Sequence, residues 1–142
     1  ISARALFKAK VDFIVATEWN ADVNYYADIA GAWVRDVHCY FIQCNTSEFG
    51  DSCIMQPSRT ETNRMVTVKG GENSTVLVGI ADIENLRAFQ FKEHILQIDD
   101  KTFKPTPPGY SKDDVEKRMN DKDFIDFDGD EAEKGRIVTG TL

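Results

Sequence analysis

One stretch constrains the fold of this chain more than any other: residues 38–57, which read HCYFIQCNTSEFGDSCIMQP. Apolar and β-branched residues run from Cys39 to Cys44, give way to a polar segment, and resume before Pro57. This pattern predicts two strands joined by a loop. The first strand has no continuous polar face, so it is expected to be covered on both sides. The rest of the chain must therefore supply two covering layers.

Helical and strand patterns alternate around this stretch. Residues between Val23 and Val37 are apolar at helical spacing, which predicts an amphipathic helix, and Gly70-Gly71 predicts a hairpin-type turn. A helix-and-strand alternation of this kind is typical of an α/β fold. The predicted strands lie near residues 11–17, 39–45, 53–57, 64–69 and 75–81, and the predicted helices near residues 2–10, 21–37 and 83–95.

The apolar runs are concentrated before Gln97. The chain is therefore predicted to divide into a folded part, residues 1–97, and an acidic, mostly irregular tail, residues 98–142, which is expected to contribute little core. A short polar helix is predicted at 111–120. The acidic run at 126–130 is interpreted as solvated, because its glycine comes too early for a calcium-binding loop.

Composition excludes several classes of partner. The formal net charge of −7 argues against direct nucleic-acid binding, which needs clustered Lys and Arg. No apolar segment approaches the roughly 20 residues of a membrane-spanning helix, so no membrane partner is expected. The chain begins with Ile1 rather than Met, and it is interpreted as an internal piece of a longer protein.

The cysteines and histidines do not form a recognisable catalytic or metal-binding pattern. Cys39, Cys44 and Cys53 are odd in number and lie inside predicted strands, which favours reduced, buried thiols and a cytoplasmic location. His38 and Cys39 cannot act as a pair, because adjacent strand residues face opposite sides. Neither His38 nor His94 has partners at ligand spacing, so no metal site and no cofactor are expected.

Several motifs follow one another in an order found in a known family. Asp36 stands where that family has Glu, Cys39-Tyr40 match directly, and Asn45 matches a strand end. A later run of the form Phe-x-Gly-x-Ser-x-Ile-x-x-Pro is matched by Phe49, Gly50, Ser52, Ile54 and Pro57. Over about residues 1–90 the chain thus resembles the carboxyl half of the nitrilase superfamily of carbon–nitrogen hydrolases. The resemblance implies that the α/β fold is part of a four-layer αββα sandwich with a mixed sheet.

A narrower resemblance rests on Trp19-Asn20, on residues 35–40, and on Lys69-Gly70-Gly71-Glu72-Asn73. These segments are similar to nitrilase-like domains at the carboxyl end of some bacterial reverse-transcriptase proteins of the phage-defence type. One departure from the wider family is that Arg35 directly precedes Asp36. An ion pair at that place would therefore need a different geometry.

The family works with a Glu, Lys and Cys triad, in which a thiolate attacks an amide or nitrile carbon. By alignment all three would lie before Ile1, so the nucleophilic Cys is expected upstream and the chain alone is expected to be inactive. Thr17, Glu18 and Trp19 would line the substrate pocket, because ligands of α/β sheets bind at strand ends. An alternative for Trp19 is packing beneath the following helix. Asp36 and Asn45 would be structural residues near the site.

Three interpretations of function remain open. The first is a fragment of an amidase-type hydrolase that acts on a small amide or nitrile. The second is a catalytically silent interaction or scaffold module of a defence-type reverse-transcriptase protein. The third is an unrelated small α/β domain, which a purely parallel sheet would favour. Half of a sandwich would leave a strand edge and apolar surface exposed, so the expected partner is the missing amino-terminal half of the same fold or another subunit.

Overall fold

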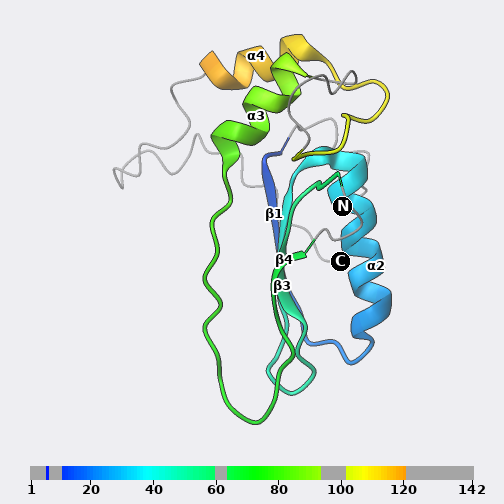
Figure 1. Ribbon diagram of the computed structural model, residues 1–142. Helices are drawn as coiled ribbons and strands as arrows, with labels where there is room; N and C mark the ends of the chain where they lie inside the picture. The colour runs from blue at the N-terminus through cyan, green and yellow to red at the C-terminus, as the bar shows by residue number, and fades with distance from the viewer. Residues whose placement is uncertain (1–5, 7–10, 60–63, 94–101, 121–142) are drawn as a thin grey trace, which may run out of the picture.

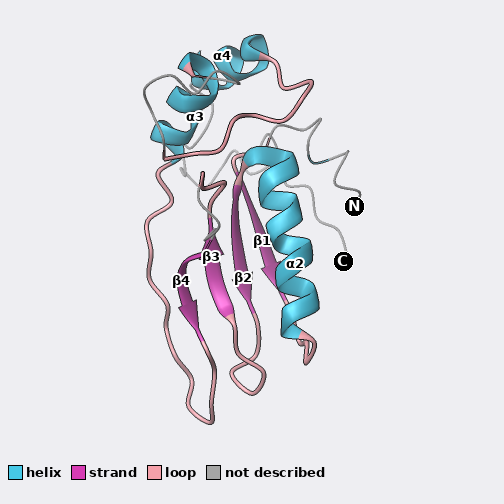
Figure 2. Cartoon of the chain, turned by 45° about the vertical axis from the view of Figure 1, so that its right-hand side comes forward, coloured by secondary structure: helices cyan, strands magenta, loops and turns pink. Residues whose placement is uncertain are grey.

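The structure is a computed structural model that describes residues 6, 11–59, 64–93 and 102–120. Its centre is a four-stranded mixed sheet in the order β1-β2-β3-β4, in which β1 and β2 are parallel and the other neighbours are antiparallel (Figure 2). This confirms the α/β class and the mixed sheet. The strands are β1 (Phe13–Thr17), β2 (Tyr40–Cys44), β3 (Ser52–Met55) and β4 (Arg64–Val68).

The helices connect and cover the strands. A parallel strand pair needs a crossover connection, and α2 with a π-helical turn provides it between β1 and β2. The helical segments are α2 (Val23–Trp33), η1 (Val34–His38), α3 (Ile83–Lys92) and α4 (Lys112–Asn120). Most of the helix predicted at 2–10, His94 and the acidic run at 126–130 lie outside the described residues. Within the described residues, no helix is long and apolar enough to cross a membrane.

One face of the sheet is covered by α2 along its length (Figure 1). The apolar stripe of the helix packs on the inward-facing side chains of three strands, and the Trp33 and Phe41 rings meet edge to face with centroids 6.3 Å apart. The buried residues of this cluster are Ala16, Ala30, Val34, Phe41, Cys53 and Met55. This is the core that the helical spacing of 21–37 predicted.

The opposite face of the sheet is covered only in part. At one end α3 packs on it, in a cluster that contains Tyr40, Leu86, Phe89 and Phe103. Towards the other edge, Phe13 and Val15 of β1 are 47% and 54% exposed. We call this surface the open face. Along β1 the exposed side chains of Phe13 and Val15 alternate with the partly buried side chain of Ile14 and the buried side chain of Ala16, as strand geometry requires.

The prediction of a strand at residues 75–81 is wrong. These residues are extended, but they are not part of the sheet. The preceding turn does not close a hairpin on β4, because the Gly71 N–H donates to the carbonyl oxygen of Ser47 at 2.8 Å. The turn is therefore held by the β2–β3 loop, and the following segment leaves the edge of β4 without pairing with it.

The expectation that the tail contributes little core is wrong for residues 102–120. Phe103, Tyr110 and Val115 are 1%, 4% and 0% exposed. The Phe89 and Phe103 rings lie 5.4 Å apart, so this segment extends the cluster beneath α3. The burial comes from two aromatic residues and one valine, which a count of large aliphatic residues does not register.

His38 fastens this cluster to the start of β2. It is fully buried, has a positive φ of 59°, and its ring stacks on Phe89 with centroids 5.9 Å apart. Its Nε2 lies 2.7 Å from the carbonyl oxygen of Lys104, which assigns the ring proton to Nε2. The Gln90 amide then donates to Nδ1 and to the His38 carbonyl oxygen, at 3.0 and 2.8 Å. This histidine is a structural residue.

Candidate functional site

The candidate site lies where the parallel strands β1 and β2 reach their carboxyl ends. Thr17 and Cys44 are partners in the strand register, and the Glu18 N–H donates to the Cys44 carbonyl oxygen at 2.8 Å. The loop after β1, the β2–β3 loop and the turn after β4 all lie at this end of the sheet (Figure 1). The structure therefore gathers here the strand-end residues that the sequence predicted.

Glu18 is the chemically most distinctive residue at this end. Its side chain is half-buried, and the Gln43 amide nitrogen lies 3.4 Å from its Oε2 atom. Burial raises the pKa of the Glu18 carboxyl, and the neighbouring Asn20 side chain opposes the rise. A carboxyl in this environment can hold a proton nearer to neutral pH than an exposed one, which is the property of a general acid or base.

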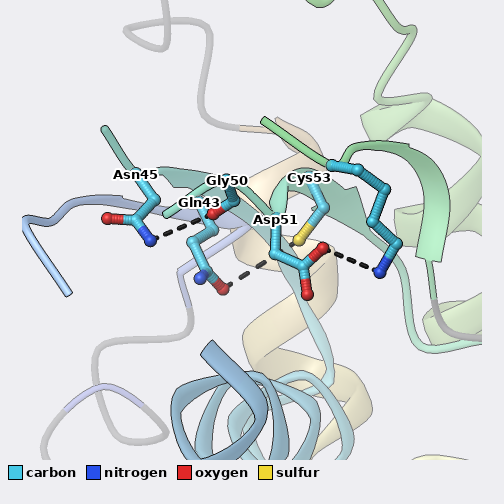
Figure 3. Close-up of polar contacts among 6 residues, drawn as sticks. Gln43, Asn45, Gly50, Asp51 and Cys53 are labelled. Atoms are coloured by element: carbon cyan, nitrogen blue, oxygen red, sulfur yellow. Dashed lines mark hydrogen bonds and ion pairs between the residues drawn. The ribbon is translucent and has the colours of Figure 1, made fainter. Parts of the chain in front are cut away.

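Behind Glu18 lies a buried polar pair that sequence reasoning missed. Gln43 is 2% exposed, and its Oε1 atom lies 3.9 Å from Cys53 Sγ (Figure 3). The Gln43 side chain thus joins the strand-end carboxyl to a buried thiol. The signal available in the sequence was a glutamine inside an otherwise apolar strand, because a buried amide needs partners.

Thr17 and Trp19 are placed differently from Glu18. Thr17 is exposed, and Trp19 is 76% exposed, so packing of Trp19 beneath the following helix is wrong. The Trp19 ring lies beside Phe49 of the β2–β3 loop, with centroids 5.9 Å apart and an interplanar angle of 54°. The two aromatic rings form a surface pair next to Glu18 rather than the wall of an enclosed cavity.

Asn45 holds the loops of this end together. Its Oδ1 atom accepts hydrogen bonds from the N–H groups of Asn20 and Thr46, at 3.0 and 2.9 Å. Its Nδ2 atom donates to the carbonyl oxygens of Asn20 and Gly50, at 2.8 and 3.0 Å (Figure 3). The side chain is fully used in fixing the loop that follows Glu18, which agrees with a structural role near the site.

We predict that Asn45→Asp lowers the free energy of unfolding by about 2–3 kcal/mol, because two N–H donations are lost and carbonyl oxygens are left facing a carboxylate. The measurement is urea denaturation at neutral pH. The matched control is Asn73→Asp at an exposed position, which should change stability by no more than about 0.5 kcal/mol. Equal losses in the two variants would contradict the role of Asn45 as a fastening residue.

The β2–β3 loop is also joined to the turn after β4. Asp51 has a side chain only 6% exposed, and its carboxylate accepts a hydrogen bond from Lys69 Nζ at 2.9 Å, although Lys69 itself is 81% exposed (Figure 3). Asp51 has a positive φ of 61°. This ion pair links the β2–β3 loop to the turn after β4.

Asp36 lies outside this cluster. It is on η1, at the opposite end of α2 from the loop that carries Glu18 (Figure 1). Its carboxylate pairs with the neighbouring Arg35, Nε to Oδ1 2.7 Å, and both side chains are more than half exposed at 59% and 54%. The displaced arginine of the sequence thus pairs with its own neighbour at the surface.

The three cysteines differ in exposure according to the face of the sheet on which they lie. Cys39 and Cys53 are buried, as predicted, whereas Cys44 is exposed, so the prediction of a core position is wrong for Cys44. Cys44 is the last residue of β2 and projects on the open face, two residues after the half-buried Ile42. Among the described residues no group of three or more His, Cys, Asp or Glu side chains could hold a metal ion.

Comparisons with protein-family models, with curated proteins and with solved structures find no match for this chain. The nitrilase resemblance therefore rests on the motifs of the sequence alone.

Glu18 also gives a pH-dependent prediction. Because its pKa is raised on folding, the proton stabilises the folded state; this contribution is complete below the ordinary value of 4.5 and is lost as the pH rises through the folded pKa. Glu18→Gln should therefore be more stable than the wild type at neutral pH, and the difference should vanish as the pH falls.

Urea denaturation between about pH 3 and pH 8 measures this difference. The matched control is Glu72→Gln, which makes the same charge change at an exposed position. A constant difference between Glu18→Gln and the wild type at every pH would rule out burial of the Glu18 carboxylate as the cause.

Proposed function

We propose that this chain is one half of a four-layer αββα sandwich of the nitrilase type, belonging to an amidase-type carbon–nitrogen hydrolase whose catalytic Glu, Lys and Cys lie outside the chain. The observation that carries the proposal is the open face, where Phe13 and Val15 are 47% and 54% exposed while α2 covers the other face. In such a sandwich each sheet has one helix-covered face and one apolar face that packs on a second sheet. The partner would be the amino-terminal half of the same fold or another subunit.

The carboxyl ends of β1 and β2 would then face the substrate, a small amide or nitrile. Glu18 would orient the substrate nitrogen or exchange a proton with it, because its pKa is raised and the Gln43 amide lies beside its carboxyl. Asn45 would fix the loop that carries this side chain, and Trp19 would border the entrance.

Ammonia release from a panel of primary amides and nitriles tests this proposal. The 142-residue chain alone should release none. A longer polypeptide that contains this chain together with the segment carrying the catalytic Glu, Lys and Cys should be active. In that polypeptide, Glu18→Gln should lower kcat/KM by about 100-fold. Cys44→Ser serves as the control and should leave the rate unchanged. Activity of the chain alone that disappears in Cys44→Ser would make this exposed thiol the nucleophile and would overturn the proposal.

A second candidate is a catalytically silent interaction module of a defence-type reverse-transcriptase protein. It is favoured by the exposure of Trp19 beside Phe49, since exposed aromatic pairs are typical of binding surfaces. Absence of a Cys at the aligned upstream position, together with loss of complex formation in Trp19→Ala, would favour this module over the hydrolase. The three free thiols support a reducing, cytoplasmic location for either candidate.

A further inference from the structure

The extended segment 75–81, which we call the arm, has the side-chain alternation of a β-strand. Gly79 faces the sheet, because a Cβ atom at this position would lie 2.7 Å from Ile54 Cδ1 and 3.1 Å from Val66 Cγ2. The alternate residues Val76, Val78 and Ile80 are 86%, 80% and 79% exposed. The arm therefore presents one side to the sheet and a row of β-branched side chains to the outside.

The main chain of the arm is also unpaired. Within residues 11–59, 64–93 and 102–120, no backbone hydrogen bond involves residues 75–80. Figure 1 shows the arm on the side of the sheet opposite to α2, with no described helix or strand on its outer side. Extended β-branched residues with free N–H and C=O groups form a template for a further strand.

Charge decides which strand fits. The arm is uncharged, but exposed acidic residues stand on both sides of it: Glu72 precedes it, and Asp82 and Glu84 follow it. In an antiparallel pair of two arms, the end of the arm next to Glu72 in each copy would lie near the end next to Asp82 in the other. Like charges brought together at both ends of a strand pair destabilise it. A segment with Lys or Arg at its ends would instead meet opposite charges at both ends.

We propose that the arm is a pairing edge for an extended apolar segment of a partner polypeptide that carries Lys or Arg at its ends. The partner adds a strand through main-chain hydrogen bonds, and its apolar side chains pack against Val76, Val78 and Ile80. The inference goes beyond the proposed function. It concerns the β3–β4 part of the same sheet face as the open face, because Gly79 lies against Ile54 and Val66, which the strand register places on the face of Val15. It holds whether or not the sandwich carries a hydrolase.

The test uses hydrogen exchange on the 142-residue chain with three synthetic peptides. The first alternates Val and Thr and has Lys at both ends; the second has Glu in place of Lys; the third is the first with alternate backbone amides N-methylated. The Lys-ended peptide should slow exchange of the amides of residues 75–80. It should bind at least about tenfold more tightly than the Glu-ended peptide, since the difference reports charge pairing. The N-methylated peptide should give no protection.

Two variants localise the effect. The double substitution Val76→Ser with Val78→Ser should weaken binding of the Lys-ended peptide by about tenfold or more, because the apolar row is lost. The matched control is Tyr25→Ser, which removes a side chain 61% exposed on α2 and should leave the Kd unchanged.

Three outcomes would overturn the proposal. Saturating peptide could give no protection in the arm, or protection could fall on β1 or β4 instead. Protection of the arm could also rise with protein concentration as the mass doubles, which would make the occupant a second copy of the chain. Ammonia release reports on the hydrolase independently, so failure of one proposal is distinguishable from failure of the other.

Discussion

Replacing Arg87 with Met should lower the free energy of unfolding by about 3–5 kcal/mol, because it removes a bidentate cation from a buried carboxylate. Arg87 on α3 donates to both carboxylate oxygens of Asp12, with Nε to Oδ1 at 3.0 Å. The two side chains are 14% and 3% exposed. Methionine keeps the apolar part of the arginine side chain, so the loss reports the charge rather than packing.

The chain supplies its own control for this substitution. Arg35 and Asp36 also form an ion pair, but their side chains are 59% and 54% exposed. Exposed pairs contribute about 0–1 kcal/mol, so Arg35→Met should shift the urea midpoint only slightly. Equal shifts in Arg87→Met and Arg35→Met would contradict the assignment of a buried, stabilising pair.

A double variant distinguishes the cost of leaving one buried charge uncompensated from the cost of removing both charges. Asp12→Leu combined with Arg87→Met replaces both charges with apolar side chains and should recover much of the stability lost in Arg87→Met alone. The coupling free energy from this cycle measures how strongly α3 is fastened to the start of β1. If the pair is decisive, the amides of α3 should also exchange faster in Arg87→Met.

The elements that sequence patterns located are those with local signals. The apolar spacing from Val23 to Val37 depends only on the packing of one helix on one face of the sheet. The sequence pattern therefore located this helix correctly. The π-helical end of this helix and the positive φ of His38 are set by contacts with Phe89, Gln90 and Lys104. Those partners are more than 50 residues away in the sequence, and no local pattern carries them.

The arm shows the limit of propensity. Residues 75–81 have the composition of a strand, and side-chain alternation is present, but a strand also needs a neighbour with free main-chain groups. Periodicity cannot register the turn at Gly71 that leads the chain away from β4. The prediction of a sheet strand at these residues is therefore wrong, although Val76, Val78 and Ile80 alternate as the side chains of a strand do.

The candidate site was predictable to a similar degree. Its position followed from strand ends, so Glu18 and Asn45 were found on the correct loops. Whether a side chain at a strand end is enclosed depends on the neighbouring loops, which a local sequence pattern does not describe. These loops leave Trp19 76% exposed. Gln43 was missed because its partners, Glu18 and Cys53, come from two other elements.

The contact between the β2–β3 loop and the turn after β4 gives the second large prediction. Gly50 has a φ of +75°, and a Cβ atom there would lie 1.8 Å from the carbonyl oxygen and 2.3 Å from the carbonyl carbon of Lys69. These are backbone atoms, so they cannot move aside as a side chain would. The two loops approach this closely only because residue 50 has no side chain.

Gly50→Ala should therefore cost about 1–2 kcal/mol for the left-handed conformation and about 1–3 kcal/mol or more for the overlap, measured as the shift in urea midpoint. Gly109→Ala isolates the first part, because Gly109 has a φ of +83° and its Cβ atom would meet nothing within 4 Å. Equal losses in the two variants would mean that the loops separate at no cost. A much larger loss in Gly50→Ala, accompanied by faster amide exchange at Asn20 and Thr46, would show that this backbone contact holds the loops around Glu18 in place.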